Sequence, residues 1–409
     1  MTTDSAYSNN WRKLHSSEAL KLLLPRLKTY GITRVANITG LDFLSIPVYT
    51  AYRPRAFSLV VSCGKGITHA DSAVSAIMES IETDVAENFP SELLLHAPYS
   101  TINKDLSLHL EYIPVLESSV FNVDTVFSWL PCRNMYTGKT KYVPAASVGL
   151  SHHLIRDPLN TFVWGSNGLA SGFSQDEARL SALYELIERD AVISWQILIR
   201  RGMVKDACID LNTISYSSTI GLVNAIHEAG LQLYLFDRAS DLGLPVYRAA
   251  IYSPYDTTIR FAEGLGCHHS DEIAINRAIT EAVQSRTVII AGSRDDLTLE
   301  KFHSLSEMNI NEQYLERLIC ENHSPLSNEF LKSFDAVDDI LRRLRQKGFL
   351  DAFEFVFPHE VEEISVVRVI VPGLQSYSHR HSVPLNRSVQ FIPRLSGLRS
   401  ALHRLRTSL

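Results

Sequence analysis

The sequence lacks the loops with which many enzymes bind nucleotides. No Gly-x-x-x-x-Gly-Lys-Ser/Thr loop is present, and no Gly-x-Gly-x-x-Gly opens a helix after a strand. The lysine, His-Arg-Asp and Asp-Phe-Gly elements of protein kinases are missing as well. These absences argue against P-loop, Rossmann and protein-kinase enzymes, so a nucleotide site would need another design.

Cysteine and histidine patterns typical of metal sites are also absent. The five cysteines lie far apart without a Cys-x-x-Cys pair, so neither a zinc knot nor a disulfide framework is indicated. Di-iron helices use two Glu-x-x-His pairs, whereas this sequence contains a single one, Glu300-Lys-Phe-His303. Adjacent histidines at 152–153 and 268–269 point opposite ways on a strand, which disfavours joint metal binding. Reduced, buried thiols are expected.

Long hydrophobic runs do not occur, and the longest, such as Ala19-Leu-Lys-Leu-Leu-Leu24, is far too short to span a bilayer. The 409 residues are 45% hydrophobic and 21% charged, with a formal net charge of −6. We therefore predict a cytoplasmic enzyme with a large core and no membrane partner. Nucleic-acid binding is not expected, because the net charge is negative and the basic run Arg342-Arg-Leu-Arg-Gln-Lys347 fits a solvated helix face.

One type of acidic segment occurs twice, as Ser75-Ala-Ile-Met-Glu79-Ser-Ile-Glu82 and Ser181-Ala-Leu-Tyr-Glu185-Leu-Ile-Glu188, with a looser third copy in residues 277–286. The Ser, Glu and Glu residues fall at i, i+4 and i+7, so they share one helix stripe. Apolar residues occupy a different stripe in matching register. They are Val74, Ile77, Met78, Ile81 and Val85 in the first helix, and Leu180, Leu183, Tyr184, Ile187 and Ala191 in the second.

The segments upstream of the first two copies also match. Gly66-Ile-Thr68-His-Ala-Asp71 aligns with Gly172-Phe-Ser174-Gln-Asp-Glu177, and each has a Thr or Ser cap with a carboxylate three residues later. This capping-box pattern predicts that both helices begin just after the cap.

The acidic stripes point to a shared metal site. A surface helix usually has Lys or Arg four residues after Glu, but only Glu185, followed by Arg189, shows this pattern. If the helices converge, their carboxylates cannot all ionise without added cations. All-oxygen ligands suit Mg²⁺. The carboxylates are Glu79, Glu82, Glu185, Glu188 and Glu281.

Because Mg²⁺ is commonly held by one or two carboxylates plus substrate phosphates, a nucleoside triphosphate bridged to these helices is the simplest interpretation. Lys65, Arg189 and Arg286 would then contact the phosphates. The alternative is that the acidic faces are ordinary solvated surfaces left by a duplication.

Several motifs resemble the ATP-binding signatures of the YcaO superfamily. They are Ser181-x3-Glu185-x-x-Glu188-Arg189, Ser72-x6-Glu79, the lead-in Gly168-Leu-Ala-Ser-Gly172 and Thr280-Glu-Ala-Val-Gln284-Ser-Arg286. The usual glutamine motif is Gln-x3-Arg, whereas here Gln284 is followed by Arg286, which departs from that spacing. The resemblance extends from about Ile32 to about Gly373.

The resemblance implies a mechanism in which ATP phosphorylates the oxygen of a tetrahedral adduct on a backbone amide, and phosphate loss completes a thioamide, azoline or amidine. ATP and Mg²⁺ would be the cofactors and a peptide or protein the substrate. By this analogy the five glutamates bind metal or support its ligands. The nucleotide contacts would be Lys65, Ser72, Ser75, Ser181, Arg189, Gln284 and Arg286. The sequence does not identify a catalytic base.

The stretch Gly31-Ile-Thr-Arg-Val-Ala-Asn-Ile-Thr-Gly-Leu-Asp42 and the segment Val369-Ile-Val-Pro-Gly373 look like YcaO proteins that work with TfuA. Azoline-forming members typically end in a proline-rich tail, whereas no proline follows Pro393 here. We therefore predict thioamide formation, with a TfuA-like partner delivering sulfur. Azoline formation on Cys, Ser or Thr is the first alternative, and an ATP-binding regulatory or assembly protein without turnover is the second. A homodimer is compatible with the resemblance.

The fold is predicted to be α+β, with the repeated acidic helices laid on mostly antiparallel sheet around the Mg-ATP site. The expected organisation is an N-terminal extension with a helix (residues 1–30), one interleaved YcaO domain (31–373), and a C-terminal loop and helix (374–409). A further helix is predicted over Phe334 to Gln346.

Overall fold

The computed structural model describes residues 12–102, 113, 121–200, 202, 204, 207–255, 259–293, 323–324, 326 and 336–375. Helices and antiparallel strands alternate along these residues, as predicted for an α+β protein. Most of the predicted C-terminal loop and helix lies outside the described residues. Elements outside the three acidic units include α1 (Ser16–Leu23), α4 (Ser217–Glu228), α8 (Ala336–Gln346), β8 (Cys208–Ile209) and β12 (His323–Ser324).

The first acidic unit is an antiparallel sheet of order β1-β2-β3 followed directly by its helix. Thr68 caps the helix: its side chain accepts a hydrogen bond from the Asp71 backbone N–H, and the Asp71 carboxylate accepts one from the Thr68 N–H. The predicted capping box is therefore confirmed. The unit comprises β1 (Arg34–Asn37), β2 (Val48–Tyr52), β3 (Val61–Lys65) and α2 (His69–Glu87).

The second unit combines one strand with a distant part of the chain. β7 (Leu169–Gly172) leads into α3 (Gln175–Arg200) and pairs with β14, whose partner residues lie 193 to 199 positions further along. Ser174 caps α3 by accepting the Glu177 N–H at 3.2 Å, as the alignment predicted. The sheet has the order β4-β5-β13-β14-β7, with β6 on β5. Its other strands are β4 (Leu95–Pro98), β5 (Val126–Asn134), β6 (Thr140–Pro144), β13 (Phe353–Val356) and β14 (Ser365–Ile370).

The third unit repeats the plan of the first. Three antiparallel strands in the order β11-β10-β9 precede a helix that contains the loose third copy of the acidic segment. Each acidic helix thus follows a strand after a short turn, as the sequence predicted. The unit comprises β9 (Gln232–Asp237), β10 (Val246–Tyr252), β11 (Phe261–Cys267) and α5 (Asp271–Ala291).

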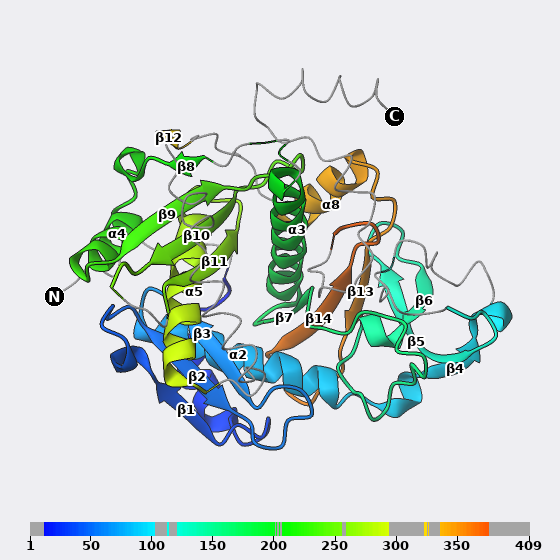
Figure 1. The fold of residues 1–409 in the computed structure, drawn as a ribbon. Helices are drawn as coiled ribbons and strands as arrows, with labels where there is room; N and C mark the ends of the chain where they lie inside the picture. The colour runs from blue at the N-terminus through cyan, green and yellow to red at the C-terminus, as the bar shows by residue number, and fades with distance from the viewer. Residues whose placement is uncertain are drawn as a thin grey trace, which may run out of the picture.

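The three units interlock in a cycle. Each helix packs on its own strand and also contacts the strand of the next unit: α2 contacts β7, α3 contacts β11, and α5 contacts β3. Figure 1 shows α2 crossing the lower part of the molecule, while α3 and α5 rise above it from separate sheets. Segments about two hundred residues apart therefore meet, and the predicted convergence of the helices is confirmed.

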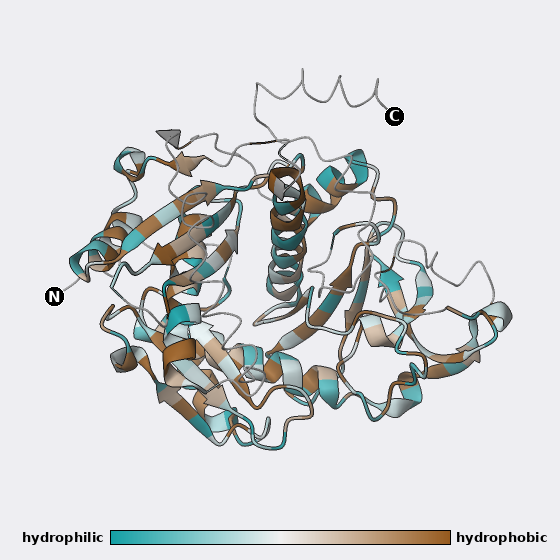
Figure 2. Cartoon of the chain, viewed as in Figure 1, coloured by the Kyte–Doolittle hydropathy of each residue, from teal (hydrophilic) through white to brown (hydrophobic). Residues whose placement is uncertain are grey.

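Three large apolar clusters support this arrangement. The predicted apolar stripes of α2 and α3 are buried throughout, and Figure 2 shows hydrophobic residues along β9, β13 and β14. Helix α1 joins the same core as α2 through Ala19 and Leu23. The predicted helix at 334–346 begins at Ala336 in the described part of the chain, with Leu341 and Leu344 buried. No helix among the described residues is long and apolar enough to cross a membrane.

Glycines allow the strands and acidic helices to approach closely. A Cβ on Gly64 would lie 2.0 Å from the Ser72 carbonyl oxygen, and a Cβ on Gly266 would lie 2.0 Å from the Ala274 carbonyl oxygen. In both units the contacted helix residue is eight positions later, so the first and third units share the same packing. These glycines hold each acidic helix against the strand that precedes it.

Candidate functional site

The first glutamate of each repeated acidic segment is held by the strand that precedes its helix, or by the residue just before that strand. In all three units its carboxylate accepts a hydrogen bond from a backbone N–H located 16 or 17 residues earlier. The shared contact shows that the third copy is structurally equivalent to the other two. The bonds join Glu79 to Cys63 (3.1 Å), Glu185 to Gly168 (3.4 Å) and Glu281 to Leu265 (3.3 Å).

A second set of equivalent positions links neighbouring units. Lys65, Ser171 and Cys267 each stand 14 residues before the first glutamate of the acidic segment in their own unit, which is Glu79, Glu185 or Glu281. Each faces a carboxylate from the helix of the preceding unit. The Ser171 N–H and hydroxyl both donate to Glu82 at 2.8 Å, and the Lys65 ammonium forms an ion pair with Glu281. These contacts connect the three acidic helices into one site.

Cys267 completes this set as a buried thiol opposite α3. Its side chain is fully buried, and burial followed by the negative charge of Glu188 raises the pKa of the thiol well above its ordinary value. The group is therefore protonated at neutral pH, and it packs as a small side chain, as expected for the cysteines of this chain. Its place in the cycle was not evident from the sequence motifs.

Burial and neighbouring carboxylates hold two of the glutamates toward their protonated forms. Burial and then the charge of Glu79 raise the pKa of Glu82 to about 8, although hydrogen bonds from Ser171 oppose this shift. Burial and the neighbouring Glu281 raise the pKa of Glu188 as well. For Glu281 itself burial acts in the same direction, but the ammonium of Lys65 outweighs it and lowers the pKa. An added cation would relieve these shifts.

Two arginines stand among the carboxylates, and only one was predicted. Arg189 forms an ion pair with Glu185 at 3.0 Å, as expected for residues four apart on a helix. Arg277 was not assigned a role from the sequence. Its positive charge acts to lower the pKa of both Glu188 and Glu281. It occupies the position of Ser75 and Ser181 in the third copy, and this alignment could have indicated its place in the site.

The N-terminal segment contacts the start of two acidic helices. The Ser16 hydroxyl donates to Asp71 in the first turn of α2, and the Lys13 N–H donates to Glu177 in the first turn of α3 at 3.4 Å. Arg12 lies in the same place, and burial lowers the pKa of its guanidinium while Glu177 opposes that effect. This approach to the site was not predicted from the sequence.

The remaining predicted nucleotide contacts fall into two groups. Ser75, Ser181 and Gln284 are half-buried on the helices that carry the glutamates. Ser72, in contrast, is fully buried, and its hydroxyl donates to the carbonyls of Gly64 at 2.8 Å and Pro47 at 3.1 Å. These two bonds tie α2 to its sheet. The nucleotide roles of all four residues stay predictions.

Arg286 is committed to contacts on another side of α5. Its side chain is 3% exposed, its Nε donates to Asp42 at 3.0 Å, and its Nη1 donates to the Ile259 carbonyl at 2.9 Å. The guanidinium also lies over the ring of Phe43. A phosphate contact by Arg286 would have to compete with this buried ion pair.

The donor set fits Mg²⁺, although no metal cage is preformed. No group of three or more His, Cys, Asp or Glu side chains within the described residues is arranged to hold a metal. Glu79, Glu82, Glu185 and Glu281 instead accept hydrogen bonds, and the last two also form ion pairs. Glu188 has the raised pKa described above. Carboxylate oxygens are what Mg²⁺ prefers, and this ion usually takes part of its coordination from water and phosphates.

We predict that the stability of the metal-free protein falls as the pH rises from 5 to 8.5. The unfolded chain releases the Glu82 proton near its ordinary pKa of 4.5, whereas the folded protein retains it until about pH 8. The free energy of unfolding therefore decreases as the pH rises across this window. Chemical denaturation at several pH values measures the slope, and Glu82→Gln should flatten it. The exposed Glu92→Gln is the matched control. An unchanged slope in Glu82→Gln would refute the assignment.

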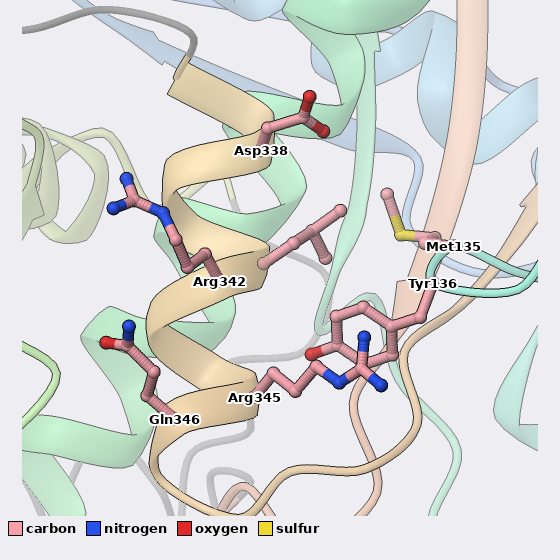
Figure 3. A pocket seen from close by; sticks show the side chains of 7 residues that line it. Met135, Tyr136, Asp338, Arg342, Arg345 and Gln346 are labelled. Carbon is pink, nitrogen blue, oxygen red and sulfur yellow. The ribbon is translucent and has the colours of Figure 1, made fainter.

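A separate surface pocket does not involve the acidic helices. It has a volume of about 560 Å³ and lies between α8 and the turn after β5, where the guanidinium of Arg345 lies over the Tyr136 ring (Figure 3). None of the predicted nucleotide or metal residues lines it. The candidate site is therefore defined by the clustered glutamates and their neighbouring cations, and not by this pocket.

Fold and site together define an α+β protein with a carboxylate-rich centre shared by three repeated helices. The sequence model described as "YcaO cyclodehydratase, ATP-ad Mg2+-binding" matches residues 63–375, so the chain belongs to the YcaO family. The predicted family and its cofactors, ATP and Mg²⁺, are confirmed. A relative from Rhizobium leguminosarum bv. trifolii, named as a protein in the tfuA 3′ region, is 33% identical over 378 residues, which cover 89% of this chain and 88% of that protein.

Solved structures agree with the fold. The structure of YcaO from Methanopyrus kandleri bound with AMPPCP and Mg²⁺ has a TM-score of 0.69 and 20% identity, covering 90% of this chain and 93% of that one. A heterocyclase in complex with substrate and cofactor has a TM-score of 0.73 and 22% identity over 89% of this chain, which spans 53% of the heterocyclase. At these identities the similarity establishes a YcaO fold.

Proposed function

We propose that this protein uses Mg-ATP to phosphorylate the oxygen of a tetrahedral adduct on a peptide backbone amide. The observation that carries the proposal is the cyclic contact of the three acidic helices, which brings glutamates from α2, α3 and α5 to one centre. A duplication kept only for packing has no need to bring carboxylates from three helices together. Membership of the YcaO family supports the same chemistry, because that family is described as binding ATP and Mg²⁺.

The residues have distinct proposed roles. Glu79, Glu82, Glu185, Glu188 and Glu281 hold Mg²⁺ or orient its ligands. Lys65 and Arg189 are now paired with glutamates, and both become available to phosphates once a divalent cation neutralises those carboxylates. Arg277 is a third cation at the same centre. When bound, Mg²⁺ neutralises the triphosphate, and the chain contributes positioning and charge stabilisation, which dominate catalysis of phosphoryl transfer.

We further propose that the product is a thioamide and that a TfuA-like partner supplies the sulfur. The name of the Rhizobium relative places that protein beside tfuA, and the similarity extends over most of both chains. A peptide or protein is the substrate. Azoline formation is the competing chemistry, because the family description specifies a cyclodehydratase.

Product mass separates the two chemistries. In a reaction reconstituted with peptide, ATP, Mg²⁺, a sulfur source and the TfuA-like partner, we expect the peptide to exchange one oxygen for sulfur. Omitting the partner or the sulfur source should abolish that product. Loss of one water from the peptide would instead identify azoline formation and refute the thioamide proposal. Nucleotide binding without any turnover would favour a regulatory role.

A further inference from the structure

Arg368 is a buried cation beside the acidic centre. It lies on β14 directly opposite Leu169 of β7, and opposite residues of antiparallel strands point to the same face of a sheet. Two positions along, Ser171 pairs with Val366 and donates to Glu82 on that face. Arg368 therefore extends on the face of the sheet that α2 covers, two positions along from the pair that contains Ser171.

The guanidinium of Arg368 has unmet hydrogen-bonding capacity. The residue is 4% exposed, and its Nε and Nη1 are enclosed without a hydrogen-bond partner among the described residues. The charge that most favours its ionised form is Glu185, yet burial outweighs that effect and lowers the pKa of Arg368 to about 10. Buried polar groups are normally satisfied, and an orphaned charge costs stability, so such a group calls for a functional explanation.

Asn167 supplies the complementary group at the same end of β7. It lies in a tight turn closed by a 2.8 Å bond from the Leu169 N–H to the Ser166 carbonyl. The next residue, Gly168, has a φ of +80°, donates its N–H to Glu185 at 3.4 Å, and accepts the N–H of Val369 at 2.8 Å. The turn is thus fixed between Glu185 and the neighbour of Arg368.

The side-chain oxygen of Asn167 is also unsatisfied. Its Oδ1 is enclosed and has no hydrogen-bond donor within the part of the chain that the structure describes. The end of β7 therefore presents a donor without an acceptor and an acceptor without a donor. A ligand that fills both needs must offer a hydrogen-bond acceptor to Arg368 and a hydrogen-bond donor to Asn167.

We propose that Arg368 and Asn167 form a subsite for the reacting backbone amide of the substrate, an inference that rests on the proposed function. Arg368 donates to the amide oxygen and polarises it, while Asn167 accepts the amide N–H. A peptide bond offers these two groups together, whereas a phosphate would satisfy Arg368 and leave the Asn167 oxygen unpaired. The subsite adjoins Glu185, so it places the amide next to the proposed Mg-ATP centre.

The test uses a minimal amide as the probe. Wild-type protein loaded with Mg²⁺ and AMPPCP is titrated with N-methylacetamide, which contains a single amide, and binding is followed by ligand-observed NMR. Methyl acetate, in which an ester oxygen replaces the only N–H, is the matched control ligand. We expect saturable amide binding and at least about tenfold weaker ester binding, as for a site that leaves a buried acceptor unpaired.

Arg368→Met and Asn167→Ala should each weaken amide binding by about tenfold or more without weakening AMPPCP binding. Arg368→Met should also raise the melting temperature of the ligand-free protein, because it removes an uncompensated buried charge; a purely structural arginine would lower it. Arg345→Met, in the separate surface pocket, is the control variant. If Arg368→Met does not fold, Asn167→Ala tests the subsite.

Equal binding of amide and ester, or amide binding unchanged in the folded variants, would overturn the subsite. AMPPCP binding without saturable amide binding would do the same and would leave the proposed nucleotide chemistry intact. Failure of the wild type to bind AMPPCP would overturn the proposed function, and this inference with it.

Discussion

Replacing Glu188 with glutamine is expected to abolish most Mg²⁺-dependent ATP binding while the protein remains folded. Glu188 is 6% exposed and lies on α3 opposite the strand of the third unit, where burial and Glu281 keep it partly protonated. Glutamine fills the same volume but cannot supply the negative charge that Mg²⁺ requires. We expect ATP affinity in the presence of Mg²⁺ to fall by about a hundredfold, and phosphate release to fall with it.

The same substitution should not destabilise the metal-free protein. It removes a buried carboxylate that is crowded by another carboxylate, so the melting temperature at pH 8 should be unchanged or higher. Asp176→Asn is the matched control, because this carboxylate belongs to the first turn of the same helix and its side chain is 72% exposed. If Glu188→Gln binds and hydrolyses ATP like the wild type, the acidic faces are structural and the proposed site is wrong.

Gly64→Ala is expected to produce the largest loss of stability. The added methyl group would lie 2.0 Å from the Ser72 carbonyl oxygen and 2.3 Å from the Ala76 nitrogen, both of which belong to the α2 backbone. Relief requires the helix to move away from its strand, which separates Glu79 from the Cys63 N–H. We expect a cost of about 3 kcal/mol or more in the free energy of unfolding, with loss of ATP binding.

Denaturant titration measures this effect, and Gly40→Ala is the control. No heavy atom lies within 4 Å of a Cβ at Gly40, so that change should be nearly neutral. A Gly64→Ala variant that matches Gly40→Ala in stability would contradict the proposed packing of α2 on β3.

Local features of the fold could be predicted because short-range rules determine them. The Thr68 cap, the apolar stripe of α2 and the i, i+4 pair of Glu185 with Arg189 all depend on residues within a few turns of one helix. The convergence of the three helices was also predictable, because repeated acidic faces need a common cation. The sequence did not predict which groups would meet each glutamate.

Those partners come from other units and could not be derived from helix periodicity. Ser171 binds Glu82 across 89 positions of sequence, and Lys65 pairs with Glu281 across 216 positions. Ser171 and Lys65 each stand 14 residues before the first glutamate of their own acidic segment, and this spacing becomes meaningful only once the cyclic order of the units is known. The buried pair of Arg286 with Asp42 was missed for the same reason, because it joins residues 244 positions apart.

The central claim is that glutamates from three separate helices form one Mg-nucleotide site, and calorimetric titration with AMPPCP tests it most directly. The wild type should bind one AMPPCP per chain only when Mg²⁺ is present. Glu82→Gln, Glu185→Gln and Glu281→Gln, one from each helix, should each abolish that single event while remaining folded. Binding that persists without Mg²⁺, or that tolerates the loss of a glutamate from any one of the helices, would contradict the account.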